Sequence, residues 1–194
     1  DGSNVENIVK YTYDNVGNKT EMYTGLNSSS DTDYAIDRYT YDFNGKVLTH
    51  TDPMGLKETY NYNANSEMTS FKSKNGNTTN YSYDNNGNLT GQKGADYSHS
   101  FSYDSMNNRT AANSGNISGT YAYDKLGRLT KESVSGNTVN YSYDRLGNML
   151  TKSVSYNGNT LTESYTYDNM SRMLTAKGNN GISTAYTYDD NGNR

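Results

Sequence analysis

The sequence repeats a short alternation of aromatic and polar residues nine times. The first aromatic position of each copy is held by Tyr11, Tyr39, Tyr60, Tyr81, Phe101, Tyr121, Tyr141, Tyr165 and Tyr186. A tyrosine follows two residues later in every copy, at Tyr13, Tyr41, Tyr62, Tyr83, Tyr103, Tyr123, Tyr143, Tyr167 and Tyr188. Side chains alternate along a strand, so both rings of a copy lie on one face. The pattern therefore predicts one strand in each repeat.

A turn signal follows the second tyrosine. Eight copies continue with aspartate, at Asp14, Asp42, Asp84, Asp104, Asp124, Asp144, Asp168 and Asp189. Six copies place glycine three residues later, at Gly17, Gly45, Gly87, Gly127, Gly147 and Gly192. Aspartate suits the first position of a type I turn, and glycine suits the fourth, where a hairpin bulge needs positive φ. We expect positive φ at these glycines; in other copies Asn107 tolerates that conformation, and Ser66 and Ser171 fit it less comfortably.

Each unit then returns through a second strand and a second turn. Residues 129–134 are expected to form such a strand, and residues 135–138 carry the returning turn signal. The fold class predicted is all-β, an antiparallel meander of repeated hairpins with about sixteen to eighteen strands, twisted or coiled into a ribbon. We expect the tyrosine pairs of successive hairpins to lie side by side, and bulges in the second, seventh and eighth copies. Residues 1–10 are interpreted as an N-terminal flank, and residues 11–194 as one array whose ninth repeat is truncated.

Composition changes this picture little. Aliphatic residues are scarce, but 21 tyrosines and a net charge of only −4 favour a folded chain over a disordered one. The 17 basic residues form no stripe, so nucleic acid is not an expected partner. No apolar run approaches the roughly 20 residues that span a bilayer, which argues against membrane insertion. The absence of cysteine leaves the redox compartment open.

The candidate chemistry is sparse, and we expect no catalytic residue, cofactor or metal site. His50 and His99 are the only histidines, and the run at residues 96–100, which contains His99, is interpreted as a surface strand and not as a catalytic triad. The turns at residues 84–88 and 189–193 resemble calcium loops, but one carboxylate per turn is too few for six to eight oxygen ligands. Exposed tyrosines can stack on sugars, so carbohydrate binding is the alternative to a purely structural ladder. Exposed edge strands also make self-association a further expectation.

The segments YSYDNNGNLT and YAYDKLGRLT resemble the YD repeat of Rhs polymorphic toxins, Tc toxin C components and teneurins. Residues 51–63, TDPMGLKETYNYN, resemble the longer Rhs form of this repeat. The resemblance implies a segment of a β-shell in a large bacterial protein, secreted or at the cell surface, which encloses or displays a C-terminal toxin domain. The implied partners are the other repeats and that enclosed domain, and the implied role is structural rather than enzymatic.

Overall fold

The computed structural model describes residues 8–26 and 34–194. Most of the predicted N-terminal flank, residues 1–7, lies outside this range, and its last three residues already belong to the first strand. The chain divides into two compact units, unit 1 (Asp1–Ser98) and unit 2 (His99–Arg194). Every regular element in the described residues is a β-strand, so none of them is a helix long and apolar enough to cross a membrane.

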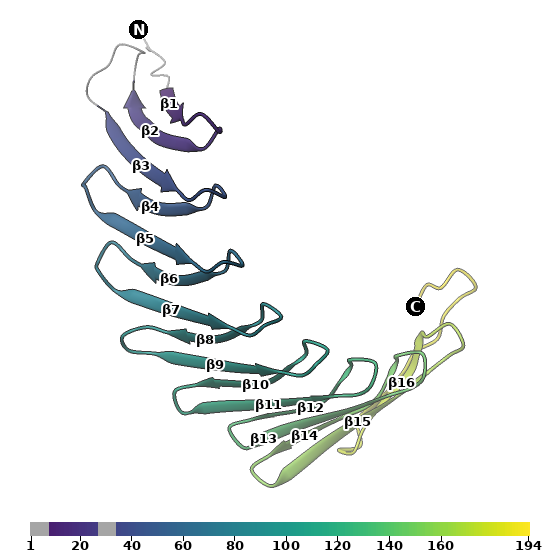
Figure 1. Cartoon of the computed structure of the whole chain (residues 1–194). Helices are drawn as coiled ribbons and strands as arrows, with labels where there is room; N and C mark the ends of the chain where they lie inside the picture. Colours follow the sequence, from purple (N-terminus) through teal and green to yellow (C-terminus); the bar gives the residue numbers. More distant parts are fainter. Residues whose placement is uncertain (1–7, 27–33) are drawn as a thin grey trace. The chain divides into compact units, whose positions relative to one another are not determined.

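Unit 1 is a meander in which each strand pairs antiparallel with the next (Figure 1). Its strands are β1 (Ile8–Tyr13), β2 (Lys19–Leu26), β3 (Ala35–Tyr41), β4 (Val47–Thr51), β5 (Lys57–Tyr62), β6 (Met68–Lys72), β7 (Thr78–Tyr83) and β8 (Leu89–Lys93). The even-numbered strands that follow the aspartate turns are short from β4 onward, with five residues each.

Unit 2 repeats the same antiparallel succession with longer strands. Its strands are β9 (Ser98–Tyr103), β10 (Arg109–Ser114), β11 (Ile117–Tyr123), β12 (Leu129–Val134), β13 (Asn137–Tyr143), β14 (Met149–Tyr156), β15 (Asn159–Tyr167), β16 (Met173–Gly178) and β17 (Ser183–Ala185). The all-β antiparallel meander is therefore confirmed within each unit, and β12 has the bounds that the sequence predicted.

The aromatic pattern sets where the strands end. In the first eight repeats the second tyrosine is the last residue of its strand, as Tyr143 is in β13. The ninth repeat departs from the prediction, because Tyr186 and Tyr188 follow the three-residue β17 instead of lying within a strand. The Tyr186 amide still donates to the Leu174 carbonyl at 2.9 Å, so the backbone continues beside β16 beyond the end of the regular strand.

Bulges are a general feature of these hairpins. The bulges expected in the second, seventh and eighth repeats are present, and the other repeats among the first eight have the same bulge. In the first eight repeats the register shifts just before the second tyrosine, as between Ala122 and Tyr123, where the partner strand skips from Lys131 to Leu129. The unpaired residue lies three positions after the positive-φ residue, as Thr130 does after Gly127, so this bulge is additional to the one within the turn.

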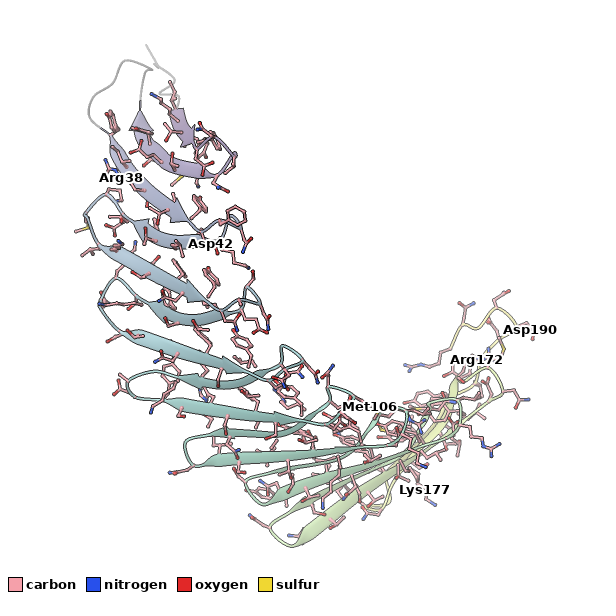
Figure 2. All side chains as sticks on the ribbon, in the orientation of Figure 1. Arg38, Asp42, Met106, Arg172, Lys177 and Asp190 are labelled. Carbon is pink, nitrogen blue, oxygen red and sulfur yellow. The ribbon has the colours of Figure 1, made fainter. Side chains whose placement is uncertain are left out.

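Neither unit has a conventional core. Among the described residues, Gly119 is the one buried residue, and no large side chain is fully enclosed. Side chains stand on both faces of the strands in each unit (Figure 2). Each unit is thus a single layer of sheet, in which most repeat tyrosines are only half-buried. Hydrogen bonds and contacts between neighbouring hairpins must therefore supply the stability that a packed interior supplies in other proteins.

Candidate functional site

In seven of the nine repeats the second tyrosine ties its hairpin to the preceding one. Its hydroxyl group donates a hydrogen bond to the backbone carbonyl of the first residue after the preceding aspartate turn, 14 to 22 residues earlier. The O–O distances lie between 2.6 and 3.1 Å. The bonds run from Tyr41 to Lys19, Tyr62 to Val47, Tyr83 to Met68, Tyr123 to Arg109, Tyr143 to Leu129, Tyr167 to Met149 and Tyr188 to Met173. We call this set the tyrosine–carbonyl ladder.

The ladder makes the stability of each hairpin depend on its predecessor. Tyr13 belongs to the first repeat and has 60 % of its surface exposed, whereas Tyr41 and Tyr62 are half-buried against the strands before them. Burial raises the pKa of Tyr41 and of Tyr62 above the usual value for a phenol. One such hydrogen bond contributes about 1 kcal/mol. Repetition of this bond gives the nearest-neighbour stability typical of repeat proteins.

The rings themselves are arranged differently from our expectation. We predicted that tyrosine pairs of successive hairpins lie side by side, and the ring contacts within unit 1 correct this. They join Tyr11 to Tyr13 on one strand, join Tyr23 to Tyr34, or join a first tyrosine to the residue opposite it, as with Tyr60 and Phe71 at a centroid distance of 5.2 Å. Tyrosines of successive repeats lie two strands apart, about 10 Å. That distance is too long for ring contact. The carbonyl that a second tyrosine reaches with its hydroxyl group lies nearer, on the adjacent strand.

Cations occupy part of the space between these rings. The Lys46 ammonium lies 5.3 Å from the centroid of the Tyr62 ring, and the Arg172 guanidinium lies 4.7 Å from that of Tyr188. A cation above an aromatic face is attracted by the ring quadrupole and contributes about 0.5–1 kcal/mol at an exposed site. The long aliphatic stems also cover the rings, so basic residues substitute here for the missing aliphatic ones.

Three of the first tyrosines, Tyr60, Tyr141 and Tyr165, donate hydrogen bonds from their hydroxyl groups to glutamates. Tyr60 donates to Glu58 at 3.0 Å, and Tyr165 donates to Glu163 at 2.7 Å. Burial and the adjacent carboxylate together raise the pKa of Tyr60 and of Tyr165 to about 12. These phenols therefore stay neutral and serve as donors over the whole physiological pH range.

Each aspartate turn is closed by its own carboxylate. In the seventh repeat the Asp144 Oδ1 atom accepts from the amides of Leu146 and Asn148, both at 2.9 Å. The hydrogen bond from the Asn148 side chain lowers the pKa of Asp144 below its usual value. The fourth turn residue has positive φ, as predicted, at all six glycines and at Ser66, Asn107 and Ser171.

The residue after the glycine position is a functional position that we did not single out. Its side chain donates to the second carboxylate oxygen of the turn, from Asn18, Asn88, Asn108, Arg128, Asn148, Arg172 or Asn193. The third repeat reverses the roles, because Asn63 replaces the aspartate and donates to Glu67 at 2.6 Å. The recurring GN and GR pairs were the visible signal for this donor position.

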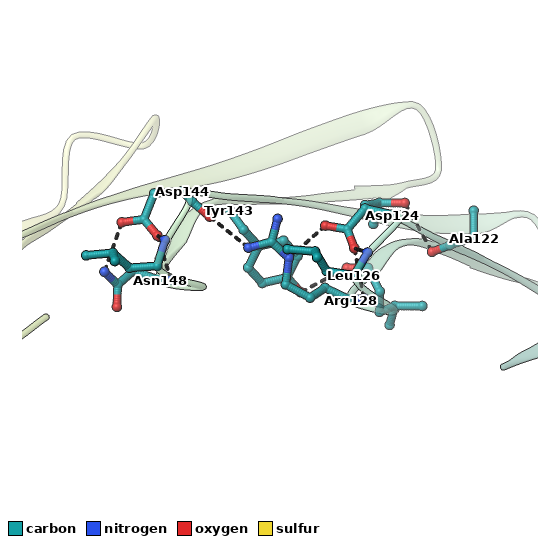
Figure 3. Close-up of polar contacts among 10 residues, drawn as sticks. Ala122, Asp124, Leu126, Arg128, Tyr143, Asp144 and Asn148 are labelled. Carbon is teal, nitrogen blue, oxygen red and sulfur yellow. Dashed lines mark hydrogen bonds and ion pairs between the residues drawn. The ribbon is translucent and has the colours of Figure 1, made fainter. Parts of the chain in front are cut away.

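An arginine at this donor position reaches the next turn as well. Arg128 donates from Nε to Asp124 Oδ2 at 2.7 Å and from Nη1 to the Asp144 carbonyl at 2.7 Å (Figure 3). Its guanidinium also lies 4.8 Å from the centroid of the Tyr143 ring. One side chain therefore holds two consecutive turns and the intervening ladder tyrosine in a fixed arrangement.

His50 lies in a polar cluster that the sequence did not reveal. Its Nε2 atom is 2.6 Å from Asp37 Oδ1, and its Nδ1 atom is 3.1 Å from Glu58 Oε2. The ring stacks on Tyr39 at a centroid distance of 4.7 Å. Burial lowers the pKa of His50, but the hydrogen bonds to the two carboxylates outweigh it and leave the pKa raised. The cluster crosses β3, β4 and β5, and both ring nitrogens already have carboxylate partners.

The described residues hold no group of three or more His, Cys, Asp or Glu side chains that could bind a metal ion. Two hollows in unit 2 have volumes of about 120 and 140 Å³. Sites for small ligands typically measure about 300–1,000 Å³. The regular features of this surface are the ladder, the turns and the cluster around His50.

The comparisons with known proteins agree with this architecture. The family model described as the teneurin YD-shell matches residues 54–194. No match was found among curated proteins. Crystal structures of TcdB2-TccC3, with and without the hypervariable C-terminal region, cover 96 % and 97 % of this chain at 15 % identity, with TM-scores of 0.65 and 0.64. The Tc holotoxin pore of Photorhabdus luminescens covers 97 % at 15 % identity, with a TM-score of 0.65.

The chain spans only 12 % of the length of each of those structures, so the likeness concerns a segment of them and shows the fold alone. The family match extends through the last seven repeats, from the sixth residue before Tyr60 to the final arginine. Both findings fit the tyrosine periodicity and the single-layer sheet. On these grounds the chain belongs to the teneurin YD-shell family.

Proposed function

We propose that the chain is a non-catalytic wall segment of a large bacterial YD-repeat protein that is secreted or displayed at the cell surface. Residues 11–194 act as one repeat array in this proposal. The array forms part of a β-shell that encloses or displays another polypeptide, such as a C-terminal toxin domain. Its partners are the other repeats of the protein and the enclosed polypeptide.

The single observation that carries the proposal is the single-layer sheet. Two wide faces remain open in each unit, and no large side chain of the described residues is fully buried. A sheet of this kind is suited to separating one space from another, because its strength comes from links along the array rather than from packing behind it. The tyrosine–carbonyl ladder supplies one such link in each of seven repeats.

The family supports the same role. Members are named for a shell built from YD repeats. The related TcdB2-TccC3 structures include one without a hypervariable C-terminal region, so the repeat-bearing fold of that protein is accompanied by a separable C-terminal part. The wall role needs no catalytic residue, which suits a surface whose polar groups are largely engaged in turns and in the ladder.

Limited proteolysis of the longer protein tests the proposal. An intact wall should protect the enclosed polypeptide from trypsin, and a wall opened by the double substitution Tyr143→Ala/Tyr167→Ala should expose it. Tyr156→Ala is the matched control, because that ring is 60 % exposed and lies outside the ladder. Equal digestion of the polypeptide in all three proteins would overturn the enclosing role.

A further inference from the structure

The turn edge of unit 2 carries a regular row of exposed apolar side chains. The third turn position is Met106, Leu126, Leu146 and Met170 in the fifth to eighth repeats. These side chains have 55 %, 72 %, 74 % and 74 % of their surfaces exposed. The same position in unit 1 is Val16, Asn44, Asn65 and Asn86, so three of those four turns present a polar residue. We call the four side chains in unit 2 the apolar turn row.

Nothing in the turn itself requires these residues. The turn is closed by the aspartate, the glycine position and the donor after it, and asparagine at the third position serves equally well in unit 1. Large apolar groups that stand in water without a structural need mark interaction surfaces. Met106 lies at such a turn in Figure 2.

The row is held rigidly. Arg128 joins the turns of Leu126 and Leu146 through its bond to the Asp144 carbonyl. The Asn148 side chain joins the next pair by donating to Ser171 Oγ at 3.1 Å. A preorganised surface loses little conformational entropy when a partner binds.

The distance between successive side chains of the row determines which shape of partner fits it. Successive turns are two strands apart, which places the apolar side chains about 10 Å from one another. An α-helix advances 10.5 Å in seven residues, roughly two turns, and returns to nearly the same face. An extended peptide covers about 10 Å in three residues, and its third side chain points to the opposite face. A helix with an apolar residue at every seventh position therefore matches the row, and an extended segment does not.

The positive charges beside the row determine the chemistry of the partner. Lys125 and Arg145 stand next to Leu126 and Leu146 and are exposed. Within the described part of unit 2 neither of them forms an ion pair. The neighbouring carboxylates of Asp124 and Asp144 are instead turned into their own turns. The cations face outward, so an acidic partner is attracted, and the identical edge of a second copy is repelled.

We propose that the apolar turn row binds an acidic amphipathic α-helix with a seven-residue apolar repeat. The helix lies along the turn edge of unit 2, with its apolar residues between the row and its glutamates beside Lys125 and Arg145. This goes beyond the wall role and does not depend on it. An interface of four side chains is small, so the affinity is in the micromolar range.

Fluorescence anisotropy with a designed peptide tests the proposal on the whole chain. The probe is a labelled glutamate-rich helix of about 28 residues, four heptads with leucine at a and d positions. We expect saturable binding. The double variant Leu126→Ser/Leu146→Ser should weaken it at least tenfold, and Val16→Ser/Phe43→Ser in unit 1 less than twofold. All four substituted side chains are exposed, at between 72 % and 103 % of their reference surfaces, so the variants should fold.

A charge-reversal variant and two competing probes complete the test. Lys125→Glu/Arg145→Glu should weaken binding of the acidic helix about tenfold and create binding of a lysine-rich helix with the same leucines. A proline-interrupted peptide of equal composition, and vesicles containing phosphatidylserine, serve as competing probes. Equal binding of the interrupted peptide, equal losses in the two serine variants, or row-dependent binding to vesicles alone would each overturn the helix proposal.

Discussion

Units 1 and 2 share one repeat and differ in several of their returning turns, although the β16–β17 turn of unit 2 is a five-residue loop like those of unit 1. In unit 1 the returning turns at β4–β5 and β6–β7 are again five-residue loops with glycine at positive φ, closed at Asp52 and Ser73. In unit 2 the turns at β12–β13 and β14–β15 are tight, with positive φ at Ser135 and Gly136 and at Asn157 and Gly158. Positive φ at both central residues is the signature of a type I′ hairpin.

The difference shows which parts of the repeat are obligatory. The ladder and the aspartate turn are present in both units, whereas the returning turn, the sheet face and the third turn position vary. Unit 1 uses this freedom for the cluster around His50, and unit 2 uses it for the apolar turn row. The constant parts hold the wall together, and the variable parts give each stretch its own surface.

The largest expected effect comes from removing a ladder tyrosine. Tyr62→Ala in unit 1 and Tyr167→Ala in unit 2 should each lower the free energy of unfolding by about 2–3 kcal/mol, since a half-buried ring and its hydrogen bond are lost. Tyr167→Phe should cost about 1 kcal/mol, the hydrogen bond alone. Hydrogen exchange followed by mass spectrometry resolves the two units, and loss of protection should centre on the altered repeat and its neighbours. Loss spread evenly over both units would contradict nearest-neighbour stability.

A smaller effect concerns the reversed turn of unit 1. Asn63→Asp places a carboxylate against Glu67, where the amide now donates, and should destabilise the hairpin by about 1 kcal/mol. Adding Glu67→Asn restores the common arrangement of an aspartate acceptor and an asparagine donor. The double variant should therefore recover the lost stability in a denaturation experiment. Additive losses would show that the pair does not act as a unit.

The sequence predicted the parts of this structure that depend on local rules. Strand alternation located the tyrosines, and turn chemistry located positive φ, including that at Ser66 and Ser171. It did not predict the hydroxyl-to-carbonyl bonds, because each joins residues at the ends of two adjacent strands, 14 to 22 residues apart in the sequence, and no local rule brings them together. The cluster around His50 was missed for a similar reason. Asp37, His50 and Glu58 come from three strands, and only the register that puts His50 opposite both Tyr39 and Glu58 brings them together.

A third prediction concerns the tight turns of unit 2. Ser135 has φ of 49°, a conformation that glycine or asparagine adopts at lower cost. Ser135→Gly should stabilise the β12–β13 hairpin by about 0.5 kcal/mol, and Ser135→Val should destabilise it by more. Thermal denaturation measures both. Asn75, an exposed residue of the five-residue loop between β6 and β7 that is not at positive φ, is the matched position, and Asn75→Gly should give no such gain.

The smallest expected effect is a pH dependence of stability in unit 1, which arises from His50. Because the pKa of His50 is raised in the folded chain, its contribution to stability is complete below about pH 6.5, the unfolded value, and is lost as the pH rises through the folded value. The hydrogen bond from His50 lowers the pKa of Glu58, whose own contribution is lost only as the pH falls below about 4.5.

Unit 1 should therefore be slightly more protected from hydrogen exchange at pH 6 than at pH 8, after correction for the intrinsic exchange rates, by well under about 1 kcal/mol. Three further groups face this cluster. Tyr39 stacks on the His50 ring, Tyr60 donates to Glu58, and the nearby Lys74 ammonium opposes the positive charge of protonated His50. His50→Gln should abolish the difference, and His99→Gln should leave it unchanged. A pH dependence in unit 1 that survives His50→Gln would assign it to another group and remove the one charge-dependent feature that distinguishes the two units.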